Sequence, residues 1–118
     1  MLGRMATNAK HDAAQARLEE LSIELVALPA VDWGRMFGSI GLRVRGKVFA
    51  VAAREGGLLI KVPEAHADAL EAAGVAGRMV MGGVARREWV LVPDEANNHV
   101  WRDQLAVALA FVDSITPQ

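Results

Sequence analysis

The side chains that most often bind metals are few in this chain and lie far apart. The histidines are His11, His66 and His99, and cysteine is absent. Metal sites need clustered ligands, commonly two histidines on one helix face or on neighbouring strands. These histidines do not have that spacing. The sequence therefore predicts no metal site and no cofactor, and it favours histidines that are exposed or lie at helix ends.

Nucleophilic and acid–base catalysis also find little support. Cysteine and tyrosine are both absent, and of the serines only Ser39 is expected on a loop that could expose its hydroxyl. No histidine is close to it in sequence, although the fold could still bring one near. The carboxylate pairs Glu19–Glu20 and Asp94–Glu95 are adjacent residues whose side chains diverge. We therefore expect a protein that is not an enzyme, with an uncharacterised enzyme as the third alternative.

A glycine-containing segment follows Phe37 and is predicted to be a loop between two strands. Its glycines, Gly38 and Gly41, have the spacing of the loop that clamps nucleotides in KH domains. That loop joins two helices, however, and this segment has no basic residue at its centre and no phosphate-binding lysine of a P-loop. The favoured interpretation is structural: the two glycines let the chain turn beneath Phe37.

Basic side chains are concentrated between Trp33 and Val62. This stretch has six basic residues against Glu55 alone, although the whole chain has a formal net charge of −1. A region of one sign can steer a partner of opposite sign, whereas a merely solvated face is commoner and is the favoured interpretation. If the region binds, we expect Arg43 and Arg45 to project from one side of a strand, beside Lys47. The candidate binding residues are Arg35, Arg43, Arg45, Lys47 and Lys61.

Arg35 and two tryptophans leave alternatives open. Arg35 is suited to bind an anion or a partner's carboxylate, and an ion pair with Asp32 or Glu88 is slightly favoured. Trp33 lies near Arg35, and Trp89 follows two arginines, as on the aromatic platforms that bind nucleic acids. Burial in the core is the commoner use of tryptophan and is favoured here.

The elements that must position these residues begin with a helix over residues 12–28. Asp12 is placed to cap it, and Pro29 ends it because the residue before a proline avoids the helical conformation. Core packing of its apolar stripe is favoured over a dimer seam. The stripe consists of Ala14, Leu18, Leu21, Leu25 and Leu28.

Strands and two further helices follow. Gly46 is expected at a hairpin tip with positive φ. The order α-β-β-β-α-β-β-α predicts a two-layer α+β sandwich, with an antiparallel sheet of about five strands and helices packed on it. The strands of this order are 42–45, 48–53, 58–62, 78–81 and 88–92, and residues 32–37 can form a short strand before them; the helices are 64–73 and one that begins within 94–98.

Length and composition indicate one domain. The chain has 118 residues, 53% of them hydrophobic, which predicts a single domain over 1–118 with a flexible segment at 1–10. No signal peptide is recognisable, and the apolar run 105–112 is too short to cross a membrane. With no cysteine to form disulfides, we expect a cytoplasmic protein.

Three segments resemble the N-terminal domain of TfoX, a bacterial family of competence regulators. They are Arg35–Leu42, Gly46–Ala50 and Leu58–Val62, which match an Arg-Met-Phe-Gly-Gly-x-Gly segment, a turn glycine with a Phe-Ala strand, and a strand ending in Leu-Lys-Val. Ser39 replaces the second glycine of the family pattern, and Arg45 stands where Asp or Asn is usual. TfoX proper has a second, C-terminal domain resembling helix-hairpin-helix modules, and we expect this protein to lack it.

The resemblance implies a stand-alone module of the TfoX N-terminal type that regulates by binding rather than by catalysis. We expect a protein partner, with a homodimer as one form of it. The alternative is a small binder of nucleic acids or anions that uses the basic sheet region.

Overall fold

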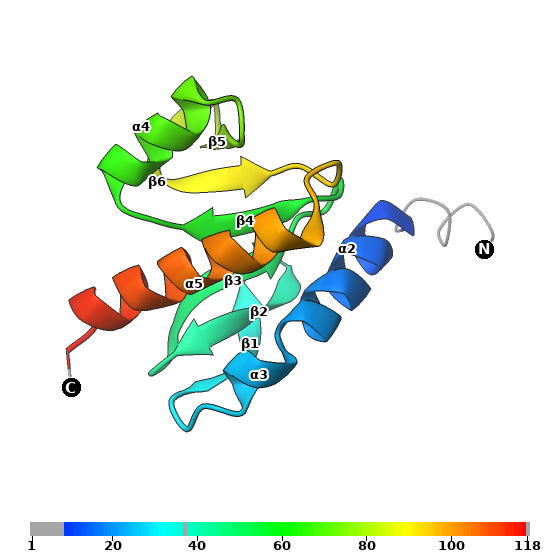
Figure 1. Cartoon of the computed structure of the whole chain (residues 1–118), viewed down its shortest axis with the longest axis vertical. Helices are drawn as coiled ribbons and strands as arrows, with labels where there is room; N and C mark the ends of the chain where they lie inside the picture. Colours follow the sequence, from blue (N-terminus) through cyan, green and yellow to red (C-terminus); the bar gives the residue numbers. More distant parts are fainter. Residues whose placement is uncertain (1–8, 37, 118) are drawn as a thin grey trace.

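The computed structural model describes residues 9–36 and 38–117, and six antiparallel strands form its single open sheet (Figure 1). The spatial order is β1-β2-β3-β4-β6-β5, so that β1 and β5 form the two edges. The sheet predicted from the sequence had about five strands. The order foreseen left out β1, which pairs with β2 along its whole length. The strands are β1 (Val31–Met36), β2 (Ser39–Val44), β3 (Lys47–Ala52), β4 (Leu58–Lys61), β5 (Gly77–Met81) and β6 (Val84–Val92).

Helices pack on this sheet, which confirms the predicted α+β fold. The long helix α5 (Asn98–Ile115) crosses β3 and β4, and α2 (Ala9–Leu21) lies beside it on β3 (Figure 1). The short helix α3 (Ile23–Val26) contacts β1, and α4 (Glu64–Ala72) contacts β5 and β6. One hydrophobic cluster joins these elements. Its largest fully buried side chains include Trp101, Phe49, Leu18, Leu42 and Ile60.

The first helical segment is broken where the sequence predicted one continuous helix. α2 ends at Leu21, and Ser22 separates it from the single turn of α3. Ser22 is fully buried, and its hydroxyl has no hydrogen-bond partner among the described residues. Asp12 lies inside the first turn of α2, so it is not the cap that we expected. Residues 1–8 of the segment expected to be flexible lie outside the described part, and Ala9 and Lys10 are helical.

The glycine segment is a strand rather than the predicted loop. Met36 pairs with Ser39 and Gly34 with Gly41, so β2 already begins at Ser39. Gly38 lies in the tight connection between the two strands with φ +72°, and Phe37 lies outside the described residues. The sequence prediction was wrong at Gly41 because a glycine in a strand can serve close approach instead of a turn. A Cβ atom at Gly41 would lie 2.7 Å from the carbonyl oxygen of Ala50.

The turn between β2 and β3 holds the glycine predicted for it. Val44 pairs with Lys47, so Arg45 and Gly46 form a two-residue hairpin loop. Gly46 has φ +85°, as expected, and Arg45 has φ +48°. Positive φ at both central residues is the pattern of a type I′ turn, which matches the twist of the flanking strands.

Candidate functional site

The five basic residues singled out from the sequence do not form one surface. Arg43 is bound to Asp32 on the neighbouring strand, with Nε and Nη2 donating to the two carboxylate oxygens at 2.9 and 2.7 Å. This two-pronged hydrogen bond lowers the pKa of Asp32 and raises that of Arg43. The Arg43 side chain also covers Gly34, where a Cβ atom would clash with Arg43 Cδ. Arg43 thus braces β1 against β2.

Arg45 contacts the C-terminal end of the long helix α5. Its guanidinium forms an ion pair with Asp113 and donates to the backbone carbonyls of Asp113 and Thr116. Carbonyl groups in the last turn of a helix lack partners within the helix, so Arg45 satisfies the C-terminus of α5. The predicted basic hairpin tip therefore has two of its three charges used in internal contacts.

Lys47 and Lys61 meet at a pocket that sequence reasoning did not foresee. The pocket has a volume of about 440 Å³ and lies between the ends of β3 and β4 and the last turns of α5. Lys61 Nζ is 3.9 Å from the Glu88 carboxylate, and Lys47 is exposed at the pocket rim. Trp89, which pairs with Lys61 across the strands, forms part of the wall.

Arg35 lies in a separate, smaller pocket of about 300 Å³ beside α2. The two carboxylates proposed as its partners contact other cations: Asp32 binds Arg43, and Glu88 faces Lys61. His11 and Ser39 line the same pocket. The five candidates are therefore distributed over two ion pairs and two pockets.

The serine with a possible catalytic role does acquire a histidine neighbour through the fold. His11 Nε2 lies 2.8 Å from Ser39 Oγ, and Ser39 Oγ donates to Gln15 Oε1 at 3.4 Å. The signal was absent from the sequence because 28 residues separate the two side chains. Ser39 is only 9% exposed and sits within β2, and His11 Nδ1 is 3.9 Å from the nearest carboxylate oxygen, that of Asp12. The contact attaches the start of α2 to β2.

The part of the chain that the structure describes contains no set of side chains suited to bind a metal ion. No group of three or more histidine, aspartate or glutamate side chains converges there. The described helices are also too short or too polar to cross a membrane.

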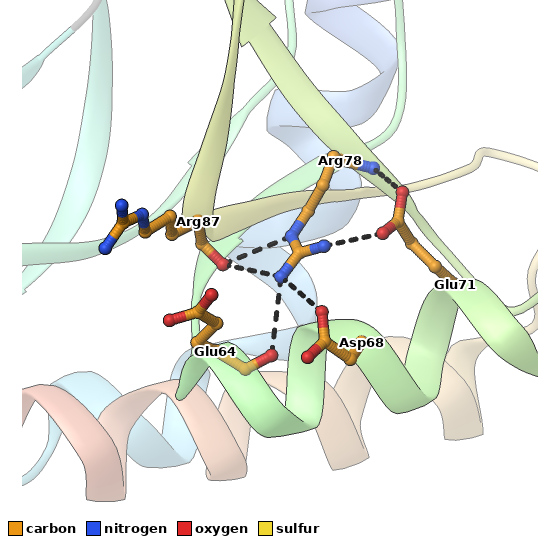
Figure 2. A network of polar contacts seen from close by, with 5 residues as sticks. All are labelled: Glu64, Asp68, Glu71, Arg78 and Arg87. Atoms are coloured by element: carbon orange, nitrogen blue, oxygen red, sulfur yellow. Dashed lines mark hydrogen bonds and ion pairs between the residues drawn. The ribbon is translucent and has the colours of Figure 1, made fainter.

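A second group of polar contacts surrounds Arg78 at the base of the β5–β6 hairpin (Figure 2). The guanidinium donates to Asp68, at 2.9 Å, and to Glu71, at 2.6 Å, both on α4. It also donates twice to the backbone carbonyl of Arg87, at 3.1 and 2.9 Å. Its side chain is only 15% exposed, and that loss of hydration would lower the pKa of Arg78, but the two carboxylates outweigh it and raise the pKa. Arg78 thus fastens both strands of the hairpin to α4.

The hairpin beyond this network projects from the sheet. β4 pairs with residues 89–92 of β6, whereas residues 84 and 85 pair only with β5. Val80 and Val84 are 64% and 60% exposed although both are apolar. We call residues 78–87 the projecting hairpin. The sequence predicted strands at 78–81 and 88–92, so it started β6 four residues too late, because the segment before Glu88 contains alanine and two arginines rather than typical strand residues.

The geometry defines a class before it defines a family: a small α+β domain in which one open antiparallel sheet carries its helices. A comparison with protein-family models matches residues 24–112 to the TfoX N-terminal domain. The chain therefore belongs to that family, as the sequence resemblance predicted. No curated protein and no solved structure matches the chain in the corresponding comparisons.

Proposed function

We propose that this TfoX N-terminal domain is a non-catalytic interaction module that binds a protein partner through the projecting hairpin. The observation that carries the proposal is the exposure of Val80 and Val84 at the tip of a braced element. Val80 pairs with Ala85 and Val84 with Met81, so the two exposed valines project from opposite faces of the hairpin tip, and a partner that encloses the tip would bury both. A hairpin held in place by Arg78 also loses little conformational freedom on binding.

The chemistry around the tip describes the partner. Arg86 and Arg87 are both exposed on β6, next to the two valines. Figure 2 shows the Arg87 side chain pointing away from the Arg78 network, toward solvent. A partner with an apolar depression flanked by carboxylates would complement both features. β5 is also an edge of the sheet, the position at which a partner's strand can pair with it.

The test compares two matched double variants in an extract of cells that make the protein. Val80→Ser with Val84→Ser removes the apolar tip, and Ile23→Ser with Leu28→Ser removes two exposed apolar side chains from a different surface. We expect a nuclease-treated extract to yield a protein that the wild type and the control retain and the hairpin variant loses. Equal retention by both variants would contradict the assignment to the hairpin. Loss of all bound material on nuclease treatment would instead favour nucleic-acid binding.

A further inference from the structure

The pocket at Lys47 and Lys61 differs from the rest of the surface in its balance of charge. Among the described residues that line it there are two lysines and no aspartate or glutamate. The pocket beside Arg35 includes Glu19, and a third cavity, next to Arg86, includes Glu64 and Glu88. The lysine pocket is thus the one among these three whose lining includes cations and no carboxylate.

Neither lysine of this pocket forms a strong ion pair among the described residues. Arg45 already satisfies Asp113 and the carbonyls at the end of α5, so Lys47 is not needed there. Among the described residues, Lys61 forms an ion pair with Glu88 alone, at 3.9 Å, a distance at which the contact is weak. An incoming anion therefore has two ammonium groups to bind and no strong ion pair to break.

The remaining wall is apolar and aromatic. Most of its other side chains are apolar, and Thr116 adds one hydroxyl; the apolar ones include Met36, Val48, Trp89, Val112 and Ile115. Ligand pockets of about 300–1,000 Å³ with a mostly apolar lining and a few polar groups are the usual form of a small-molecule site. At about 440 Å³ this pocket has the size of such a site.

We propose that the pocket binds a small organic anion, with a carboxylate or phosphate held by Lys47 and Lys61 and an apolar, flat body packed against Trp89 and the α5 side chains. Ammonium groups fix the position of the charged head, because hydrogen bonds to ionised groups are about twice as strong as neutral ones. The indole and the aliphatic side chains favour a ring or chain that water solvates poorly. The site is distinct from the projecting hairpin, so each can be tested alone.

The probe for this class is 2-naphthoate, and its neutral isostere is 2-naphthamide. Nuclear magnetic resonance titration would follow the Trp89 indole signal, assigned with Trp89→Phe. We expect 2-naphthoate to bind, to shift this signal and to bind more weakly with added salt. Changing Lys47→Gln together with Lys61→Gln should weaken binding about tenfold or more, because charged hydrogen bonds are lost.

Lys10→Gln is the matched control, because Lys10 is the one lysine of the chain besides Lys47 and Lys61, and it lies on α2. It should change the affinity by less than about twofold, since it is outside the pocket. Ile115→Glu places a carboxylate on the lining and should weaken 2-naphthoate binding without the loss of a lysine. Unchanged urea midpoints would show that these exposed changes leave the fold intact.

Three results would overturn the proposal. The first is equal affinity for 2-naphthoate and 2-naphthamide, or no binding of either. The second is the same affinity in the double lysine variant as in the wild type. The third is tighter, lysine-dependent binding of a ten-residue deoxythymidine oligonucleotide, which would assign the pocket to single-stranded nucleic acid.

Discussion

At the scale of single residues, Arg45 and Gly46 show how one turn can serve both local geometry and long-range contact. Both have positive φ, which L-residues other than Gly, Asn and Asp adopt at a cost. Arg45 tolerates this conformation while its side chain binds the end of α5. Asp or Asn, which are usual in the family at this position, adopt positive φ more readily than arginine does. Arg45 instead provides a contact between the sheet and α5.

Replacing Gly46 with valine should lower the free energy of unfolding by about 1–2 kcal/mol, which is the penalty of the left-handed conformation for a residue with a Cβ. The loss is conformational, because nothing lies within 4 Å of a Cβ built there. Gly77→Val is the matched control: it also has open space but lies in β5 without a positive φ. Urea unfolding should show the control unchanged or more stable. Equal losses at both positions would mean that the turn does not impose the strain.

At the scale of elements, the apolar stripe of α2 and α3 decreases in burial along the chain. Leu18 is fully buried, Leu25 is half-buried against the core, and Leu28 is 46% exposed. The stripe ends in solvent because Ser22 interrupts the helix before the last two leucines. This gradient indicates core packing for the first part of the stripe.

Alanine substitutions along the stripe should follow the gradient of burial. We expect Leu18→Ala to cost about 2–5 kcal/mol and Leu25→Ala about 1–2 kcal/mol, since the cost depends on the cavity left behind. Leu28→Ala should stay within about 0.5 kcal/mol, as exposed substitutions do. Urea unfolding at two protein concentrations would measure all three. A loss at Leu28 that shrinks as the protein is diluted would reveal a dimer seam instead, because dilution removes the dimer that the substitution weakens.

At the scale of the whole molecule, the part that matches the family is smaller than the part that packs together. The match begins at residue 24, whereas α2 ends at Leu21. Yet α2 supplies Ala14 and Leu18 to the core, and Arg17 donates to Asn98 Oδ1 and to the carbonyls of Asp94 and Ala96. The Arg17 guanidinium also lies 3.8 Å from the ring centre of Trp101, close enough for a cation–π contact.

A chain that starts at residue 24 should therefore lose its cooperative unfolding transition. Removal of α2 uncovers part of the apolar cluster that a domain of this size needs. Circular dichroism during urea titration would show a broad transition, and the exposed core would bind a hydrophobic dye. Arg17→Met in the full chain is the graded comparison and should keep a cooperative transition at a lower midpoint. An unaltered, sharp transition of the shortened chain would show that α2 is an accessory element.

The sequence predicted most of this architecture because its signals are local. Turn glycines such as Gly46, the proline that ends the first helix and the apolar stripe of that helix are read within a few residues, and they predicted the elements and the α+β class. The positions of Arg43, Arg45 and Ser39 could not be read in this way, because their partners lie 11 to 71 residues away. Alternation predicted that Arg43 and Arg45 would act together, but Arg45 lies in the turn, where alternation no longer holds. The lysine pocket likewise arises only when the end of α5 meets the sheet.

The bonds of Arg17 also bear on how the chain reaches this fold as it is synthesised. They join residue 17 to residues 94–98. Arg17 on α2 therefore cannot form these hydrogen bonds until the segment that leads into α5 has been synthesised. The hairpins of β1 to β4 need only neighbouring residues and can form early, since short loops close at little entropic cost. Until α5 leaves the ribosome, however, the sheet face that buries Trp101 has no cover. Completion of this domain thus depends on the synthesis of α5, and until then its apolar face is available to chaperones.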